Sequence, residues 1–209
     1  MKRPVLQQRV LVDGPAGAIE TVIDVSGDPR GIALIAHPHP LHGGTLDNKV
    51  VQSLARAFTE LGYVSLRPNF RGVGASEGKH DEGRGETDDM LAVLAYAQER
   101  FGNLPVSLGG FSFGASVQTR VAKRCTVRRM VLVATAVGRF AAEAVPADTV
   151  VIHGELDETV PLADIFDWAR PQGLPVIVIP GADHFFHRRL HLIRNIVTSM
   201  LAAPVAQND

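Results

Sequence analysis

The sequence predicts an α/β fold, a three-layer αβα sandwich in which helices cover both faces of a mostly parallel sheet. The chain opens with a predicted hairpin, and short apolar runs then alternate with segments of helical periodicity. Loops rich in glycine or proline follow several of these runs. With 209 residues the chain is long enough to bury a sizeable core, and we expect residues 1–209 to form a single domain.

The first predicted elements are strands. Residues 5–12 and 19–25 flank the turn sequence Asp-Gly-Pro-Ala-Gly at 13–17, which is typical of a hairpin. Residues 31–36, Gly-Ile-Ala-Leu-Ile-Ala, form a continuous apolar run of the kind found in buried strands. This run stops at the His-Pro-His-Pro sequence of residues 37–40, because proline has no N–H to donate to a sheet.

The first helix is predicted over residues 50–61, where apolar side chains recur at helical spacing. We expect Asp47 to cap its start and Gly62 to end it. Further strands are predicted at 63–66, 104–108, 129–135, 149–153 and 176–179, and further helices at 86–100, 114–123, 162–170 and 188–201. Because a helix between two strands crosses one face of the sheet, this order favours parallel strands.

Composition and charge exclude several classes of protein. The net charge is −1, with 21 basic and 22 acidic residues and no run of like charge, so we expect neither a nucleic-acid nor a membrane partner. A single cysteine, Cys125, excludes an intrachain disulfide and fits a reducing compartment. The start of the chain lacks the apolar region of a signal peptide, and no apolar stretch approaches the length of a membrane span. We therefore expect a cytoplasmic protein.

The segment Gly110-Phe111-Ser112-Phe113-Gly114 lies where a predicted strand meets a predicted helix. Small residues near a serine allow a sharp turn that holds the hydroxyl above the carboxyl edge of the sheet. The pattern therefore predicts that Ser112 is a nucleophile. The alternative is a glycine-rich turn whose serine has no chemical role.

A nucleophilic serine needs a base, and the base needs a carboxylate that orients it. Downstream of the serine, the strand at 149–153 leads into a loop that contains Glu155, Asp157 and Glu158. Ligands gather at the carboxyl ends of strands in open α/β sheets, so we expect Asp157 to be the orienting carboxylate. Glu155 and Glu158 compete for this role, and Asp157 could instead only cap the next helix.

His184 is the predicted base, because it follows the strand at 176–179 by one short loop. His187 and His191 fall on the helix predicted next, where a solvated or capping histidine is more common. His153 ends a strand and is expected to be buried.

Acyl transfer also needs two donors aimed at the oxygen that becomes negative. One would be the backbone N–H of Phe113, the residue after the nucleophile. The other should come from the loop after the strand at 31–36. Pro38 and Pro40 of this loop have no N–H, so the donor must be His39 or Leu41. We favour Leu41, because it leads into two consecutive glycines, and leave His39 open.

The same loop raises a metal alternative. The pattern His37-x-His39-x-x-His42 resembles the histidine cluster of metallo-β-lactamase-type hydrolases, which have an aspartate where this chain has Leu41. No later set of histidines or aspartates has the spacing of zinc ligands. We therefore predict no metal and no other cofactor, and expect His37 and His39 to shape the loop through side-chain hydrogen bonds.

Residues 67–78 form a second glycine-rich loop. Its glycines are not followed by the Lys-Ser/Thr pair of a phosphate-binding loop. We predict a structural turn at the rim of the pocket, in which Arg71 ties loops together.

Five segments together resemble a known family, the small bacterial α/β-hydrolases without a lid, which are serine hydrolases related to dienelactone hydrolases. The segments are HPHPLHGGTLDNKVV at 37–51, RPNFRGVGASEG at 67–78, GFSFG at 110–114, HGELDETVP at 153–161 and GADHFF at 181–186. The resemblance implies an α/β-hydrolase fold with about eight strands and a triad of Ser112, Asp157 and His184. Dienelactone hydrolases themselves carry a cysteine where this chain has Ser112, so lactone specificity does not follow.

A lid would be inserted between the strands at 129–135 and 149–153, but residues 136–148 are too few for a cap domain. An open, shallow site favours small-molecule esters with small or short-chain acyl groups. The predicted function is therefore that of a serine esterase (carboxylesterase) that forms an acyl-enzyme. The alternatives are a thioesterase or small-peptide hydrolase with the same triad, or a catalytically silent hydrolase-fold binding protein. A homodimer is compatible with the sequence.

Overall fold

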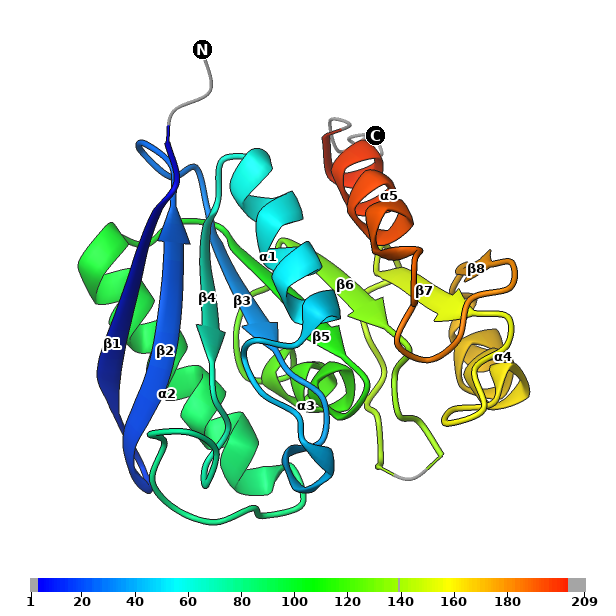
Figure 1. The fold of residues 1–209 in the computed structure, drawn as a ribbon, viewed down its shortest axis with the longest axis horizontal. Coiled ribbons are helices and arrows are strands. Elements are labelled where there is room, and N and C mark those ends of the chain that lie inside the picture. Colours follow the sequence, from blue (N-terminus) through cyan, green and yellow to red (C-terminus); the bar gives the residue numbers. More distant parts are fainter. Residues whose placement is uncertain (1–3, 139, 203–209) are drawn as a thin grey trace.

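The computed structural model describes residues 4–138 and 140–202, in which eight strands form one sheet of order β1-β2-β4-β3-β5-β6-β7-β8 (Figure 1). The strands are β1 (Leu6–Gly14), β2 (Gly17–Val25), β3 (Ile32–Ala36), β4 (Val64–Pro68), β5 (Val106–Phe111), β6 (Arg129–Val133), β7 (Val150–Gly154) and β8 (Val176–Ile179). β2 pairs antiparallel with β1 and β4, and all other neighbours are parallel. The predicted fold class is confirmed. The single domain expected for residues 1–209 extends beyond the described residues and stays a prediction.

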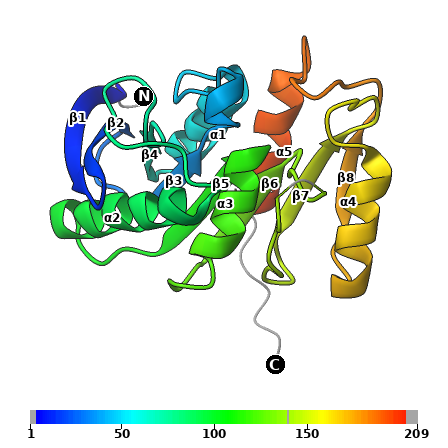
Figure 2. The ribbon, with the colours of Figure 1, turned by 90° about the horizontal axis from the view of Figure 1, so that it is seen from below.

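Helices cover both faces of the sheet. They are α1 (Lys49–Glu60), α2 (Arg84–Phe101), α3 (Phe113–Val121), α4 (Leu162–Ala169) and α5 (Leu190–Ala202), with short 3-10 turns η1 (Pro40–His42) and η2 (Arg170–Gln172). Figure 2 shows α1 and α5 on one face and α2, α3 and α4 on the other. The result is the predicted three-layer sandwich.

The alternation of side chains along β3 explains why its sequence is apolar throughout. Ile32 and Leu34 pack into the core beneath α2 and α3, whereas Ala33 and Ile35 pack into the core beneath α1 and α5. All four side chains are completely buried. A strand covered on both faces cannot show the polar alternation of a half-exposed strand.

The start of α1 differs from the prediction. Asn48, not Asp47, is the N-cap: its side-chain oxygen accepts the N–H groups of Val50 and Val51 at 2.9 and 3.4 Å. The Asp47 side chain is largely exposed, and its carboxylate lies 3.9 Å from Nη1 of Arg67. Asparagine and aspartate cap helices equally well, so sequence preference could not decide between neighbours.

The connection between β6 and β7 is short and irregular. In residues 134–138 and 140–149 the structure contains neither helix nor strand, so the prediction of no cap domain is confirmed. Among the residues placed in the structure, no helix has both the length and the apolar character needed to cross a bilayer.

Candidate functional site

Ser112 is the single residue between β5 and α3, and its backbone is strained. Its φ of 55° and ψ of −119° lie in a region that residues other than glycine rarely adopt. The surrounding structure holds this conformation, because the Ser112 N–H donates to the carbonyl of Val133 at 2.9 Å. The side chain does not cap α3, which leaves its hydroxyl available for other partners.

The glycines of this segment are required by close backbone packing. A Cβ at Gly110 would lie 2.6 Å from Cα of Ala115, and a Cβ at Gly114 would lie 2.3 Å from the carbonyl oxygen of His37. Both approaches are much closer than van der Waals contact. The glycines therefore let α3 begin directly against the sheet and against the loop after β3.

The structure brings Ser112, His184 and Asp157 together at the carboxyl ends of β5, β7 and β8. Oγ of Ser112 lies 3.1 Å from Nε2 of His184, and Nδ1 of His184 lies 2.7 Å from Oδ2 of Asp157. All three residues are at least nine-tenths buried. With the Nδ1 proton held by the carboxylate, the lone pair of Nε2 faces the serine hydroxyl.

The other carboxylates near Asp157 have different partners. Glu155 accepts the backbone N–H of Gly181 at 2.7 Å and so ties two loops together, and Glu158 is exposed to solvent. Asp157 does not cap α4, whose N-cap is Pro161, and its Oδ1 instead accepts the N–H of Val160 at 2.8 Å within the preceding loop. Its second oxygen remains for His184.

His153 is completely buried, as expected from its place at the end of β7. Its Nε2 lies 2.9 Å from the carbonyl oxygen of Val160 and 3.6 Å from Oδ2 of Asp157. Burial lowers the pKa of His153, so the ring is neutral and donates from Nε2. This histidine therefore supports the loop that carries Asp157.

Two further histidines lie apart from Ser112. His187 precedes α5 instead of lying on it, and its Nδ1 lies 2.6 Å from Oδ2 of Asp183. His191 is exposed on α5. In contrast, the ring of His184 packs between Phe111 and Phe185, with centroid distances of 5.0 and 5.1 Å.

A pocket of about 390 Å³ opens beside Ser112. It is lined by His39, His42, Ser112, Phe113, Ala136, Gly138, Phe140, Thr159, Val160 and Asp164. A larger pocket of about 630 Å³ lies between α1 and the start of the chain, where Arg67 and Asp24 line it. None of the three residues of the Ser112–His184–Asp157 set lines that larger pocket, so we place the chemistry in the smaller one.

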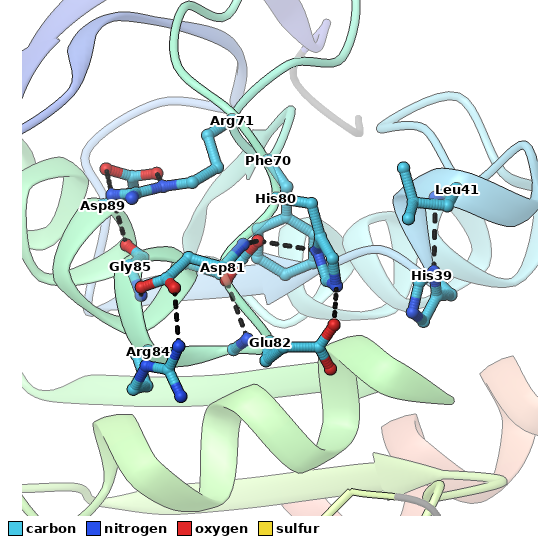
Figure 3. Close-up of polar contacts among 12 residues, drawn as sticks. His39, Leu41, Phe70, Arg71, His80, Asp81, Glu82, Arg84, Gly85 and Asp89 are labelled. Atoms are coloured by element: carbon cyan, nitrogen blue, oxygen red, sulfur yellow. Dashed lines mark hydrogen bonds and ion pairs between the residues drawn. The ribbon is translucent and has the colours of Figure 1, made fainter.

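The loop after β3 is shaped by its histidines, as predicted. His37 accepts the N–H of Phe70 at Nε2 (2.9 Å), and its Nδ1 lies 2.7 Å from the carbonyl oxygen of Pro38. Nδ1 of His39 accepts the N–H of Leu41 at 3.2 Å (Figure 3). Because both nitrogens of His37 have protein partners, this ring has no lone pair for a metal. The described parts of the chain contain no group of three or more His, Cys, Asp or Glu side chains that could hold a metal ion.

Sequence reasoning missed two residues beside this loop, His80 and Glu86. The His80 ring lies 4.8 Å from the His39 ring and 5.4 Å from the Phe113 ring, measured between centroids. Glu86 lies in the first turn of α2 and is completely buried, which is unusual for a carboxylate. In the sequence, His80 stands shortly before the helix predicted at 86–100 and Glu86 is its first residue, and this placement was the only signal for the two residues.

Comparisons with known proteins identify the family of this chain. The model of a family described as "Serine aminopeptidase, S33" matches residues 28–172. The protein RP471 of Rickettsia prowazekii, described as uncharacterized, is 34% identical over 195 residues, which cover 85% of this chain and 82% of that protein.

Two solved structures of bacterial proteins are similar over nearly the whole chain. An α/β serine hydrolase homologue from Coxiella burnetii is 38% identical with a TM-score of 0.87, covering 93% of this chain and 97% of that one. XC6422 from Xanthomonas campestris, described as an α/β serine hydrolase without lid, is 34% identical with a TM-score of 0.88, covering 97% and 96%. The predicted resemblance to lidless bacterial α/β serine hydrolases is confirmed, whereas the relation to dienelactone hydrolases stays a prediction.

Proposed function

Because this chain belongs to the serine aminopeptidase S33 family of hydrolases, we propose that it cleaves carboxylic esters of small or short-chain acyl groups with a triad of Ser112, His184 and Asp157. One observation carries the proposal: Oγ of Ser112 lies 3.1 Å from Nε2 of His184, whose Nδ1 lies 2.7 Å from Asp157. The strained backbone of Ser112 supports it, because such strain clusters at functional sites.

The chemistry is a two-step acyl transfer. Nε2 of His184 takes the hydroxyl proton of Ser112 as Oγ bonds to the ester carbonyl carbon, and the carbonyl oxygen becomes negative. When the tetrahedral adduct collapses, the bond to the alcohol oxygen breaks and His184 gives it the proton. A water then attacks the acyl-serine by the same route, which releases the acid and restores Ser112. Asp157 stabilises the imidazolium in both steps.

The developing oxyanion would be held by the backbone N–H groups of Phe113 and His39. Phe113 is the first residue of α3, so the helix itself offers its N–H no acceptor. For the second donor we choose His39 over Leu41, which the sequence favoured. His39 lines the pocket, whereas Leu41 is 71% exposed and its N–H already donates to His39 Nδ1.

The decisive test is Ser112→Ala. Turnover of p-nitrophenyl acetate is expected to fall by about 10⁴-fold, because the base then has no nucleophile to activate. The exposed Ser199→Ala on α5 is the matched control and should keep full turnover. A fluorophosphonate probe should label Ser112 in the wild-type protein. Unchanged turnover in pure Ser112→Ala contradicts the proposal, and absence of labelling favours a silent hydrolase-fold binding protein.

The substrate class is tested by a panel of esters of graded length. A pocket of about 390 Å³ without a cap favours acetyl and butyryl esters over octanoyl esters in kcat/KM. Acetyl thioesters and amino-acid p-nitroanilides belong in the same panel, because a thioesterase or an aminopeptidase could use the same triad. A higher kcat/KM for octanoyl esters, thioesters or p-nitroanilides contradicts the short-chain ester assignment while leaving the triad in place.

A further inference from the structure

His80 lies in the loop between β4 and α2, outside the proposed triad, and its side chain is only 8% exposed. Its ring contacts both His39 and Phe113, whose own rings are 4.9 Å apart. These are the two residues proposed to donate backbone N–H groups to the oxyanion. One imidazole therefore packs against the side chains of both proposed donors.

The Glu86 carboxylate lies against this imidazole. Nδ1 of His80 lies 2.8 Å from Oε1 of Glu86, an ion-pair distance at which neither ring nitrogen has the geometry of a hydrogen bond. The Glu86 carboxylate is itself held by the backbone N–H groups of Asp81 and Gly83, at 2.9 and 2.8 Å. The carboxylate also lies in the first turn of α2, at the partly positive amino end of the helix. The other ring nitrogen of His80 lies 3.5 Å from Glu82, which is largely exposed (Figure 3).

The loop that carries His80 is also anchored to α2. Nε and Nη2 of Arg71 each lie 2.8 Å from an oxygen of Asp89, and Nη2 also donates to the carbonyl of Gly85 at 2.8 Å (Figure 3). Arg71 therefore ties its loop to a helix, whereas the sequence predicted that it ties loops together. The planar, two-point contact leaves the start of the loop little freedom.

A role in fold stability alone explains the buried His80–Glu86 contact poorly. Removing an imidazole and a carboxylate from water costs free energy that their attraction only partly offsets, and apolar residues of the same volume often stabilise a protein as well or better. A fixed carboxylate 2.8 Å from an imidazole nitrogen does, however, restrict where the ring can lie.

From these contacts we propose that His80 and Glu86 are a positioning pair for acyl transfer, in which the oriented His80 ring packs on His39 and Phe113 and keeps their backbone N–H groups aimed at one point. The inference rests on the proposed function, because only a negative oxygen in the reaction would use both donors. His80 does not line the pocket, so it acts through the two residues that do. A displacement of about 1 Å at such a site can lower the rate about 100-fold.

The test compares two substitutions of His80. His80→Asn keeps a polar side chain beside Glu86 but removes the ring, and we expect kcat for p-nitrophenyl acetate to fall about 10- to 100-fold with KM nearly unchanged. His80→Phe keeps a ring against His39 and Phe113, and we expect it to retain more kcat than His80→Asn, although its melting temperature should fall because the buried Glu86 carboxylate then faces an apolar ring. Each variant is assayed well below its melting temperature.

Inhibition by a trifluoromethyl ketone distinguishes a positioning residue from a merely structural one. Oγ of Ser112 adds to the ketone carbon, His184 takes the proton, and the ketone oxygen becomes an oxyanion held by the two donors. Its inhibition constant should rise in His80→Asn by about the factor by which kcat/KM falls, because both quantities report binding of the same charge. The exposed His191→Asn on α5 is the control and should change neither quantity.

The outcomes separate this inference from the proposed function. If Ser112→Ala is inactive while His80→Asn keeps wild-type kcat and inhibition constant, the positioning pair is refuted and the triad stands. A fall in kcat without weaker inhibition also refutes the pair. If Ser112→Ala keeps full turnover, the proposed function itself fails.

Discussion

Asp157 divides its two carboxylate oxygens between two kinds of partner. Oδ1 accepts the backbone N–H groups of Thr159 and Val160, at 2.9 and 2.8 Å, and Oδ2 faces Nδ1 of His184 at 2.7 Å. Because two N–H donors need an acceptor at Oδ1, the backbone decides which atom of residue 157 meets the histidine. A replacement with an amide would have to obey the same constraint.

Asp157→Asn is therefore expected to inactivate the protein while keeping its fold. The amide oxygen must stay with Thr159 and Val160, so the amide N–H₂ faces His184 and forces its proton onto Nε2, where it can no longer accept the Ser112 proton. We expect kcat for p-nitrophenyl acetate to fall by about 10⁴-fold with a small change in KM. Glu158→Gln, the exposed neighbour, is the control. A loss of less than tenfold in Asp157→Asn contradicts this account.

The sequence predicted some residues of the candidate site and missed others, and the difference lies in what fixes the position of each residue. Ser112, Asp157 and His184 each follow the end of a parallel strand, so the fold class alone brings them to one edge. His80 has no such rule, because its contact with His39 and Phe113 depends on how a long loop folds back on α2. The choice between His39 and Leu41 depended on a side-chain hydrogen bond within one short turn, which spacing does not reveal.

At the scale of elements, the turn from β5 to α3 has no connecting loop. β5 continues to Phe111, beyond its predicted end, because the ladder with β3 runs through Gly109 and Gly110. The helix then starts at Phe113, so its first turn lies directly over the last residues of the strand. Periodicity predicted both elements, but the junction depends on backbone packing that the sequence shows only as a run of glycines.

The two glycines of this strand give a matched pair of substitutions. A Cβ at Gly110 would meet the backbone of α3 at 2.6 Å, whereas a Cβ at Gly109 would meet only side-chain atoms at 3.4 Å or more. Gly110→Ala is expected to lower the free energy of unfolding by about 1–3 kcal/mol and to reduce kcat, because α3 must move away from the sheet and carries the Phe113 N–H with it. Gly109→Ala should lower both the free energy of unfolding and kcat by less. Equal effects in urea unfolding and in turnover would contradict the argument.

At the scale of the whole molecule, two histidines are buried without charge beneath the site loops. His37 and His153 are each completely buried, and each contacts a backbone carbonyl. Burial lowers the pKa of His37 from 6.5 to about 4 and lowers the pKa of His153 as well. Both loops that shape the site are therefore built around neutral imidazoles.

Stability should consequently fall as the solution becomes acidic. Between pH 6.5 and about 4 the unfolded chain binds a proton at residue 37 that the folded chain does not, so the contribution is fully present above pH 6.5 and is lost as the pH falls toward 4. For His37 the loss amounts to about 3 kcal/mol at the lower limit. Urea unfolding at pH 7 and pH 5.5 measures the onset of this loss, because unperturbed carboxylates, with pKa values of about 4, remain ionised over that range. His37→Gln, which keeps an acceptor for the Phe70 N–H but does not titrate, should show a flatter pH dependence, and exposed His191→Gln should keep the wild-type one. A wild-type midpoint that does not move, or an undiminished slope in His37→Gln, would show that neutral burial of His37 does not limit the fold in acid.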